Sequence, residues 1–380
     1  MLIETYSKRI KPFFTGFDRT FVLFVVLLIA VGILTLYSAS FNMPGRVQDQ
    51  LRNVLLTFVL MWGIANLSPQ ILMRLAVPLY TVGISLLIAV ALFGLVRKGA
   101  QRWINIGIVV QPSEIMKIAM PLMLAWYYQR RESALRWYDH IAALALLAIP
   151  VGLIAKQPDL GTAVLVFAAG FFVIYLAGLS FKLILPILLA VTIAAGSLIA
   201  FEHKICQPQT QWPLLHDYQK HRICTLLDPT TDPLGKGFHT IQAVIAIGSG
   251  GIFGKGWLKG TQAHLEFIPE RHTDFIFAVY AEEFGLVGSI ALLLLYLCLI
   301  VRGLYVAANG ATLFARLLAG SLTLSFFTYA FVNIGMVIGL LPVVGVPLPF
   351  MSYGGTALVT LGIAVGLVLS MGRQKRLIQS

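Results

Sequence analysis

The sequence predicts an all-α polytopic membrane protein with about ten transmembrane helices and one long extracytoplasmic loop between the seventh and eighth helices. Of its 380 residues, 58% are hydrophobic and 12% are charged, and the mean hydropathy is +0.85. A soluble domain carries about 25% charged residues, so this chain is too apolar to fold without a bilayer. Its net charge of +12 does not indicate nucleic acid, because the basic residues mostly flank apolar runs. We expect residues 1–380 to form a single membrane domain.

Apolar runs recur that are long enough to cross about 30 Å of hydrocarbon at about 1.5 Å per residue. They cover residues 20–40, 51–67, 74–96, 112–128, 139–156, 160–179, 182–202, 275–301, 313–340 and 352–372. The first run follows a basic segment, as in a signal peptide, but the further runs favour a retained first helix. GxxxG spacings at Gly335 and Gly339 and at Gly362 and Gly366 predict close helix packing.

The distribution of Lys and Arg predicts that both termini are cytoplasmic. In that orientation the cytoplasmic segments hold fourteen basic residues, and the short loops on the other face hold five, as the positive-inside rule requires. The fourteen are Lys8, Arg9, Lys11, Arg19, Arg74, Arg130, Arg131, Arg136, Lys182, Arg302, Arg316, Arg373, Lys375 and Arg376, and the five are Arg46, Arg52, Arg97, Lys98 and Arg102. The loop of residues 203–274 then lies on the periplasmic face of an inner membrane, and a loop of that length is usually functional.

Several common chemistries are disfavoured by the motifs that the chain lacks. Cys206, Cys224 and Cys298 have neither the CxxC spacing of a zinc or redox site nor the even count of a disulfide scaffold, although a bridge between Cys206 and Cys224 stays open. No HExxH or GxSxG motif is present, which argues against a zincin and an elbow-type serine hydrolase.

A glycine-rich run from Ile247 to Gly256 suggests a phosphate cradle but matches no nucleotide motif. Ser249 stands where a P-loop needs glycine, and Phe253 stands where GxGxxG needs its last glycine. One interpretation is a backbone nest that holds a phosphate with help from Lys255 and Lys259. The composition favours the other interpretation, a flexible loop.

Charged residues within the apolar runs indicate partners or a wet cavity, because a lone charge in a bilayer costs about 2.5–3.5 kcal/mol. Glu114 and Lys117 follow a helix start at Pro112 and are three residues apart, so they share a helix face and can pair. This pair either fixes packing or contributes to a substrate site. Lys156 and Asp159 flank a proline–glycine break, where snorkelling and helix capping are the favoured roles.

Asp274 follows a polar run and directly precedes the apolar span that begins at Phe275. A carboxylate at the boundary of water and lipid is partly desolvated, which favours its neutral form and prepares it to accept a proton. A carboxylate at this boundary would also be within reach of both the polar head group and the tail of a lipid. The alternative is an ordinary helix N-cap, for which aspartate is favoured. The sequence alone leaves both interpretations open.

Five runs together resemble the shape, elongation, division and sporulation (SEDS) family, and the resemblance covers nearly the whole chain. The runs are Lys98–Ile104, Gln111–Glu114, Gln157–Thr162, Pro269–Phe275 and Pro349–Gly355. Val343–Gly345 stands where division members of the family typically have a lysine, which favours the elongation branch. The stretch 203–213 is longer than this branch leads us to expect, and no function is assigned to it.

The resemblance implies a glycosyltransferase that polymerises lipid II into glycan strands on the periplasmic face during cell elongation and rod-shape maintenance. Asp274 matches the family's catalytic aspartate and would take a proton from the GlcNAc 4-hydroxyl of lipid II. Arg102, Lys117 and Arg271 would stabilise the departing undecaprenyl diphosphate. Glu114 would hold Lys117.

The remaining site and partner expectations also come from the resemblance. Glu266 would orient the loop or help to hold a divalent cation, Mg²⁺ or Mn²⁺, the one candidate cofactor. The substrate-binding set is Arg102, Glu114, Lys117, Asp159, Lys255, Glu266, Arg271 and Ser352. Expected partners are lipid II, the nascent glycan strand, a single-span class B penicillin-binding protein that packs near residues 275–340, and other membrane proteins of the elongation complex.

Two other functions fit part of the sequence. A lipid II flippase suits the intramembrane charges, but transporters tend to show two related halves with broken helices, and no such repeat is visible. A non-catalytic scaffold of the elongation complex leaves the charged residues without a role.

Overall fold

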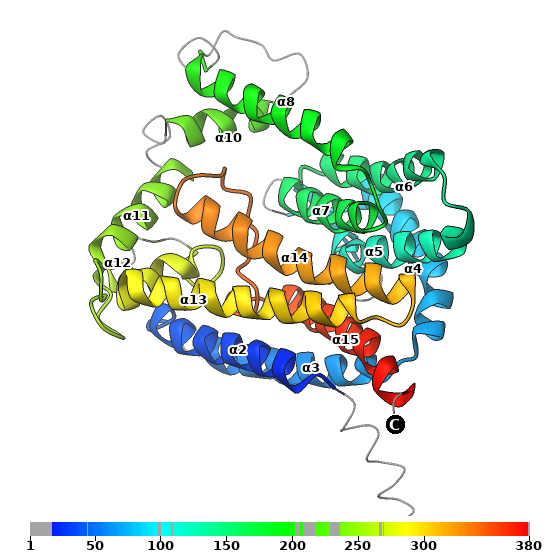
Figure 1. Ribbon diagram of the computed structural model, residues 1–380. Coiled ribbons are helices and arrows are strands. Elements are labelled where there is room, and N and C mark those ends of the chain that lie inside the picture. The colour runs from blue at the N-terminus through cyan, green and yellow to red at the C-terminus, as the bar shows by residue number, and fades with distance from the viewer. Residues whose placement is uncertain are drawn as a thin grey trace, which may run out of the picture.

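The computed structural model describes residues 17–43, 45–97, 100–105, 107, 109–201, 206–207, 217–228, 236–265, 268 and 270–378, and these residues are mostly helical (Figure 1). A helix overlaps each predicted apolar run. These helices are α2 (Arg19–Ala39), α3 (Arg46–Ala65), α4 (Pro69–Phe93), α5 (Pro112–Arg131), α6 (Trp137–Lys156), α7 (Leu160–Leu176), α8 (Phe181–Ala200), α13 (Ile276–Ala308), α14 (Leu313–Val337) and α15 (Gly355–Ile378). The predicted helix start at Pro112 is confirmed.

Six of the described helices are long and apolar enough to cross a membrane. They are α2, α4, α6, α13, α14 and the part of α15 from Gly355 to Arg373, while α7 is apolar but has only 17 residues. Large apolar side chains such as Leu92 and Leu297 are exposed on these helices, as on surfaces that face lipid. The chain is therefore a multi-span membrane protein, and a count of ten crossings stays a prediction.

Close packing between α3 and α15 depends on glycine. Gly362 and Gly366 of α15 lie against Thr57 and Met61 of α3, and a Cβ at either glycine would collide with them. The close packing predicted from this GxxxG spacing is confirmed. The other spacing has a different role, because Gly339 lies beyond the end of α14 with φ +79°.

The helices α2 and α13 run antiparallel and are tied at both ends. At one end, the Asp18 carboxylate accepts hydrogen bonds from Arg302 Nε at 3.0 Å and Nη2 at 2.7 Å. At the other end, the Ser38 hydroxyl donates to the Glu283 carboxylate. The twenty residues from Asp18 to Ser38 span about 30 Å, which is the thickness of the hydrocarbon layer.

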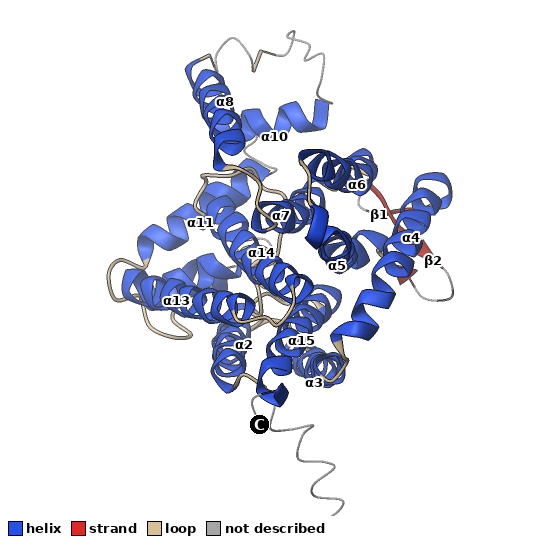
Figure 2. Cartoon of the chain, turned by 45° about the vertical axis from the view of Figure 1, so that its right-hand side comes forward, coloured by secondary structure: helices blue, strands red, loops and turns tan. Residues whose placement is uncertain are grey.

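The structure contains strands and short helices between the predicted spans that the sequence did not predict. A small antiparallel sheet follows α4, with strand order β1 (Leu95–Arg97), β2 (Ala100–Asn105), β3 (Val109–Val110), so the all-α prediction needs this correction (Figure 2). The described residues of the segment predicted as a long loop, 203–274, include three helices: α10 (Asp217–Leu227), α11 (Lys236–Ser249) and α12 (Thr261–His264).

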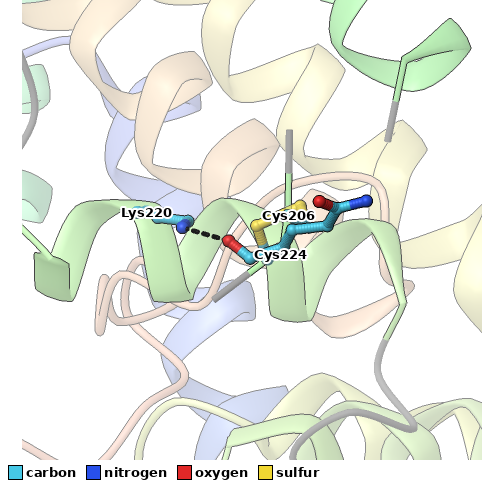
Figure 3. The surroundings of a disulfide bond; sticks show 4 residues. Cys206, Lys220 and Cys224 are labelled. Carbon is cyan, nitrogen blue, oxygen red and sulfur yellow. Dashed lines mark hydrogen bonds between the residues drawn. A yellow bond between two sulfur atoms is a disulfide. The ribbon is translucent and has the colours of Figure 1, made fainter. Parts of the chain in front are cut away.

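A disulfide joins Cys206 to Cys224, with the two Cα atoms 5.7 Å apart (Figure 3). The sequence left this pairing open. The bond attaches the chain beyond α8 to α10, and Lys220 Nζ donates to the Gln207 carbonyl at 2.7 Å beside it. In Figures 1 and 2, α8 and α10 lie together at one edge of the bundle.

Candidate active site

Asp274 is half-buried and lies two residues before the start of α13. The N-cap of α13 is Phe275, whose side chain makes no capping hydrogen bond, so Asp274 does not occupy the N-cap position that the alternative interpretation gave it. The backbone carbonyl of Asp274 accepts a hydrogen bond from Asn333 Nδ2 at 2.9 Å. Its carboxylate faces Gly345, where a Cβ would lie 3.4 Å from Asp274 Oδ2.

The three residues before Asp274 are attached to two other elements. Arg271 Nε donates to the carbonyl of Ala39, at the end of α2, at 2.7 Å. The His272 carbonyl accepts from the Tyr353 amide at 2.9 Å, and the Thr273 carbonyl accepts from the Ser352 hydroxyl at 2.7 Å. A site whose backbone is fixed in this way holds its reactive side chain in one geometry.

The segment 338–354, between α14 and α15, enters the helix bundle and carries Ser352 with it. A Cβ at Gly32 would lie 2.6 Å from Met351 Cα, and Gly32 is seven residues, or about 10 Å, from the end of α2. Gln50 of α3 anchors the returning chain, because its amide donates to the Ser352 carbonyl at 3.2 Å. Met351, the neighbour of Ser352, therefore lies about 10 Å inside the end of α2.

A polar cluster, separate from the Asp274 segment, surrounds Asp159 at the start of α7. Its carboxylate accepts from the Thr162 amide at 3.4 Å, which confirms the predicted cap, and from Gln111 Nε2 at 2.9 Å. Arg102 of β2 lies 3.7 Å from the same carboxylate and also donates to the Pro158 carbonyl. The unpredicted sheet thus brings Arg102 to the break between α6 and α7.

The predicted pair of Glu114 and Lys117 forms at 2.6 Å, one turn along α5 from Gln111. Lys117 is buried and its Nζ lies 5.4 Å from the centre of the Tyr329 ring, while Thr360 of α15 donates to the other Glu114 oxygen at 3.2 Å. Each charge has a partner, as burial requires.

Residues 344–346 lie between the Asp274 segment and the polar cluster around Asp159. A Cβ at Gly161 of α7 would lie 2.7 Å from the Val344 carbonyl oxygen, and the neighbouring Gly345 faces the Asp274 carboxylate. The structure therefore brings Asp274, Ser352, Asp159 and Arg102 around one segment of chain.

Two of the predicted substrate-binding residues, Lys255 and Arg271, contact other groups. Lys255 Nζ pairs with the buried Glu282 of α13 at 2.6 Å, and Arg271 uses its guanidinium on the end of α2. Glu266 lies outside the described residues. Within the part of the chain that the structure describes, no group of three or more His, Cys, Asp or Glu is placed to hold a metal ion, so those side chains do not form a metal site by themselves.

Sequence reasoning missed Asn333 and Gln50, which position the site. Asn333 is fully buried in α14 and its amide joins the carbonyls of Asp274 and Val346. The signal in the sequence for Asn333 was its position as a lone amide side chain in an otherwise apolar run. Such a group needs hydrogen-bond partners in a membrane.

Comparison with known proteins gives consistent matches over nearly the whole chain. The FTSW_RODA_SPOVE family model, described as a cell cycle protein, matches residues 18–377. The peptidoglycan glycosyltransferase MrdB of Escherichia coli strain K12 is 48% identical over 362 residues, which cover 95% of each chain. The peptidoglycan glycosyltransferase RodA of Treponema pallidum is 30% identical, covering 95% of this chain and 98% of the relative.

Two solved structures share the fold. One comes from a study of how a peptidoglycan synthase complex coordinates polymerization and crosslinking, with a TM-score of 0.78 and 34% identity. The other is the rod shape determining protein RodA of Thermus thermophilus, with a TM-score of 0.69 and 29% identity. Each covers 95% of this chain and is itself covered to 98%.

Proposed function

The chain belongs to the FtsW, RodA and SpoVE family, and from this premise we propose that it polymerises lipid II with Asp274 as the general base. Its activity is that of a peptidoglycan glycosyltransferase, as in relatives 48% and 30% identical. The observation that carries the assignment of the base is the half-buried Asp274 carboxylate, next to a backbone that α2, α14 and the segment before α15 all contact. A fixed, partly desolvated carboxylate suits general-base catalysis.

In the proposed reaction, Asp274 takes the proton of the GlcNAc 4-hydroxyl of lipid II. The oxygen forms a bond to the anomeric carbon of the growing chain's terminal MurNAc. The bond from that carbon to the diphosphate oxygen breaks, and undecaprenyl diphosphate leaves with the electron pair. The transition state resembles an oxocarbenium ion, with negative charge increasing on the diphosphate, so a nearby cation lowers the barrier.

Arg102 is the best placed of the three candidate cations. Its side chain is 29% exposed and its Asp159 partner is at 3.7 Å, whereas Lys117 is 7% exposed and pairs at 2.6 Å. A diphosphate can therefore displace Asp159 from Arg102 at lower cost than it can displace Glu114 from Lys117, because the contact of Arg102 is longer and its side chain is more exposed. Lys117 contributes its positive charge to the site without contacting the diphosphate, and Glu114 holds Lys117 in place.

The proposed orientation puts both termini in the cytoplasm and Asp274 on the periplasmic face of the inner membrane. The excess of Lys and Arg on the cytoplasmic side supports it. The disulfide between Cys206 and Cys224 is a second support, because disulfides persist in the oxidising periplasm and are rare in the cytosol.

The proposed partner is a class B penicillin-binding protein whose single membrane helix docks between α13 and α14. An apolar groove of about 450 Å³ lies there, lined mainly by side chains of the two helices, including Leu297, Ile300, Phe327 and Phe331. A groove of this composition fits an apolar helix. Ala330→Trp would fill the groove and should abolish co-purification of the partner, whereas Leu23→Trp, an exposed position on α2, should not.

Polymerisation is tested against transport with purified protein and its partner in vesicles that contain fluorescent lipid II. The proposal predicts glycan polymer from lipid II in the leaflet that contacts the active site. Movement of intact lipid II between leaflets without polymer would favour a flippase. Neither product, with the partner bound, would favour a scaffold.

A further inference from the structure

The glycine-rich turn, residues 250–258, is inserted into the hydrogen-bond ladder of α13. In an uninterrupted helix, the amides of Leu286 and Val287 would donate to the carbonyls of Glu282 and Glu283. Here they donate to Gly251 and Ile252 of the turn at 3.0 and 3.1 Å. In return, the Glu282 and Glu283 carbonyls accept from the amides of Lys255 and Gly256 of the turn, at 3.1 and 2.9 Å.

This insertion explains the break in α13 at Gly285, whose φ is +66°. A Cβ at Gly285 would collide with the backbone of Gly254, and a Cβ at Gly254 would collide with the Glu283 carbonyl. Glycine is required at both positions because the two backbones approach so closely. The turn and α13 therefore form one unit.

The insertion also gives a role to two carboxylates that are fully buried in α13. Glu282 Oε1 accepts from Lys255 Nζ at 2.6 Å and from the Gln262 amide at 3.0 Å. Glu283 Oε1 accepts from the Leu258 amide at 3.1 Å and from the Ser38 hydroxyl. Irregular backbone is tolerated at membrane depth only where protein satisfies its polar groups, and these carboxylates do so.

The contacts of the turn place it inside the apolar layer. The pair formed by Ser38 and Glu283 lies about 30 Å from the pair formed by Asp18 and Arg302, so it lies near one boundary of the hydrocarbon. Ile252 contacts Val287, which lies four residues, or about 6 Å, further into the hydrocarbon layer than Glu283. Trp257 Nε1 donates to the carbonyl of Leu34 at 3.2 Å, and Leu34 lies equally far inside Ser38.

The turn exposes apolar side chains at this depth. Ile252 is 60% and Phe253 is 82% exposed, and they continue an exposed apolar strip formed by Leu286, Val287 and Ile290 on the spanning part of α13. Lys255, in contrast, points inward to Glu282. Large exposed apolar side chains beside a lipid-facing helix surface are themselves suited to lipid.

We propose that the glycine-rich turn is a re-entrant segment embedded in the leaflet on the Asp274 side, where Ile252 and Phe253 contact phospholipid acyl chains. Part of the segment predicted as a periplasmic loop thus returns into the bilayer. The proposal requires that the chain spans a membrane, but it does not depend on the glycosyltransferase mechanism.

Site-directed spin labelling of the full chain in phospholipid bilayers tests this proposal. A nitroxide is attached to Phe253→Cys in a Cys298→Ser background, which removes the exposed free thiol and keeps the disulfide. Ile290→Cys provides the lipid-facing reference, and Ser133→Cys, an exposed position in the short connection between α5 and α6, provides the aqueous reference. Collision of each label with oxygen, which concentrates in lipid, is compared with collision with a water-soluble nickel chelate.

The proposal predicts that label 253 behaves like label 290, with frequent oxygen collisions and few nickel collisions. Nickel accessibility equal to that of label 133 would overturn it. Low accessibility to both reagents would also overturn it, because protein rather than lipid would then cover the turn. Thermal unfolding of each labelled variant close to that of the Cys298→Ser parent establishes that the label reports on the native fold.

Discussion

The proposed general base, Asp274, and the candidate cation Arg102 are held in opposite ways. The segment around Asp274 makes hydrogen bonds of 2.7–2.9 Å with three separate elements, whereas Arg102 of the strand β2 donates to the Pro158 carbonyl and lies 3.7 Å from its carboxylate partner. A base must present the same geometry at every turnover, so a rigid backbone suits it. A cation that binds a diphosphate must exchange one anionic partner for another, and a long, partly exposed contact permits that exchange.

The largest effect on stability is expected at Lys117, which tests whether this cation belongs to the fixed part of the site. Lys117→Met leaves the Glu114 carboxylate, which is 16% exposed, without its cationic partner, and the loss of one partner of a buried ion pair costs about 3–5 kcal/mol. Thermal unfolding in detergent should show a large decrease in Tm. The double variant Glu114→Gln with Lys117→Met should recover most of it. A single variant as stable as the wild type would show that the pair does not fix packing.

Ser352→Ala tests the fixed side of the comparison. The change removes the hydroxyl that donates to the Thr273 carbonyl and accepts from the Leu348 amide at 2.8 Å, so both groups lose a partner at a cost of about 1–3 kcal/mol. We expect the kcat of polymerisation to fall by about tenfold, with KM for lipid II little changed.

A matched control for Ser352 is Ser321→Ala. Ser321 is also fully buried and its hydroxyl makes one backbone hydrogen bond, to Ala169 at 2.6 Å, within the contact of α7 and α14. It should lose stability while retaining kcat. Equal kcat values for the two variants would refute a positioning role for Ser352.

Arg102→Lys tests the exchangeable side. Lysine keeps the charge but loses the paired donors that suit a phosphate, so binding should weaken while stability stays nearly constant. We expect KM for lipid II to rise several-fold, with kcat changed less. Arg52→Lys, at an exposed side chain in the second turn of α3, is the control and should match the wild type. A Tm decrease comparable to that of Lys117→Met would contradict the account.

The smallest effect on activity is expected from removal of the disulfide. Cys206 and Cys224 attach the chain beyond α8 to α10, and α8 and α10 lie at one edge of the bundle (Figure 1). Cys206→Ser should leave polymerisation almost unchanged but accelerate proteolysis between α8 and α11. The disulfide restricts the conformations of this part of the chain, and its removal lets the chain open more easily to a protease. Loss of polymerisation with an intact fold would show that this edge contributes to the site.

Local properties of the sequence predicted local structure. Hydropathy located the helices, Pro112 marked the start of α5, the three-residue spacing predicted the pair of Glu114 and Lys117, and Asp159 was identified as a cap. Each of these depends on residues close together in the chain, for which helix periodicity and capping rules apply.

Contacts between distant segments could not be predicted in the same way. Asn333 meets the Asp274 carbonyl across 59 residues, and the glycine-rich turn joins α13 through backbone groups that carry no side-chain signal. The sheet that carries Arg102 consists of short strands, one of only two residues, too short for a period-2 pattern to be recognised. These contacts assemble the site, so its full geometry required the structure.

The most direct test of the central claim is polymerisation by Asp274→Asn, which has the same shape as the wild type but cannot accept the proton. With partner binding, lipid II binding and Tm matched to the wild type, the account predicts a loss of kcat of at least about 100-fold, as expected for removal of a general base. Polymerisation close to that of the wild type would contradict it and would require the proton to be accepted by another group.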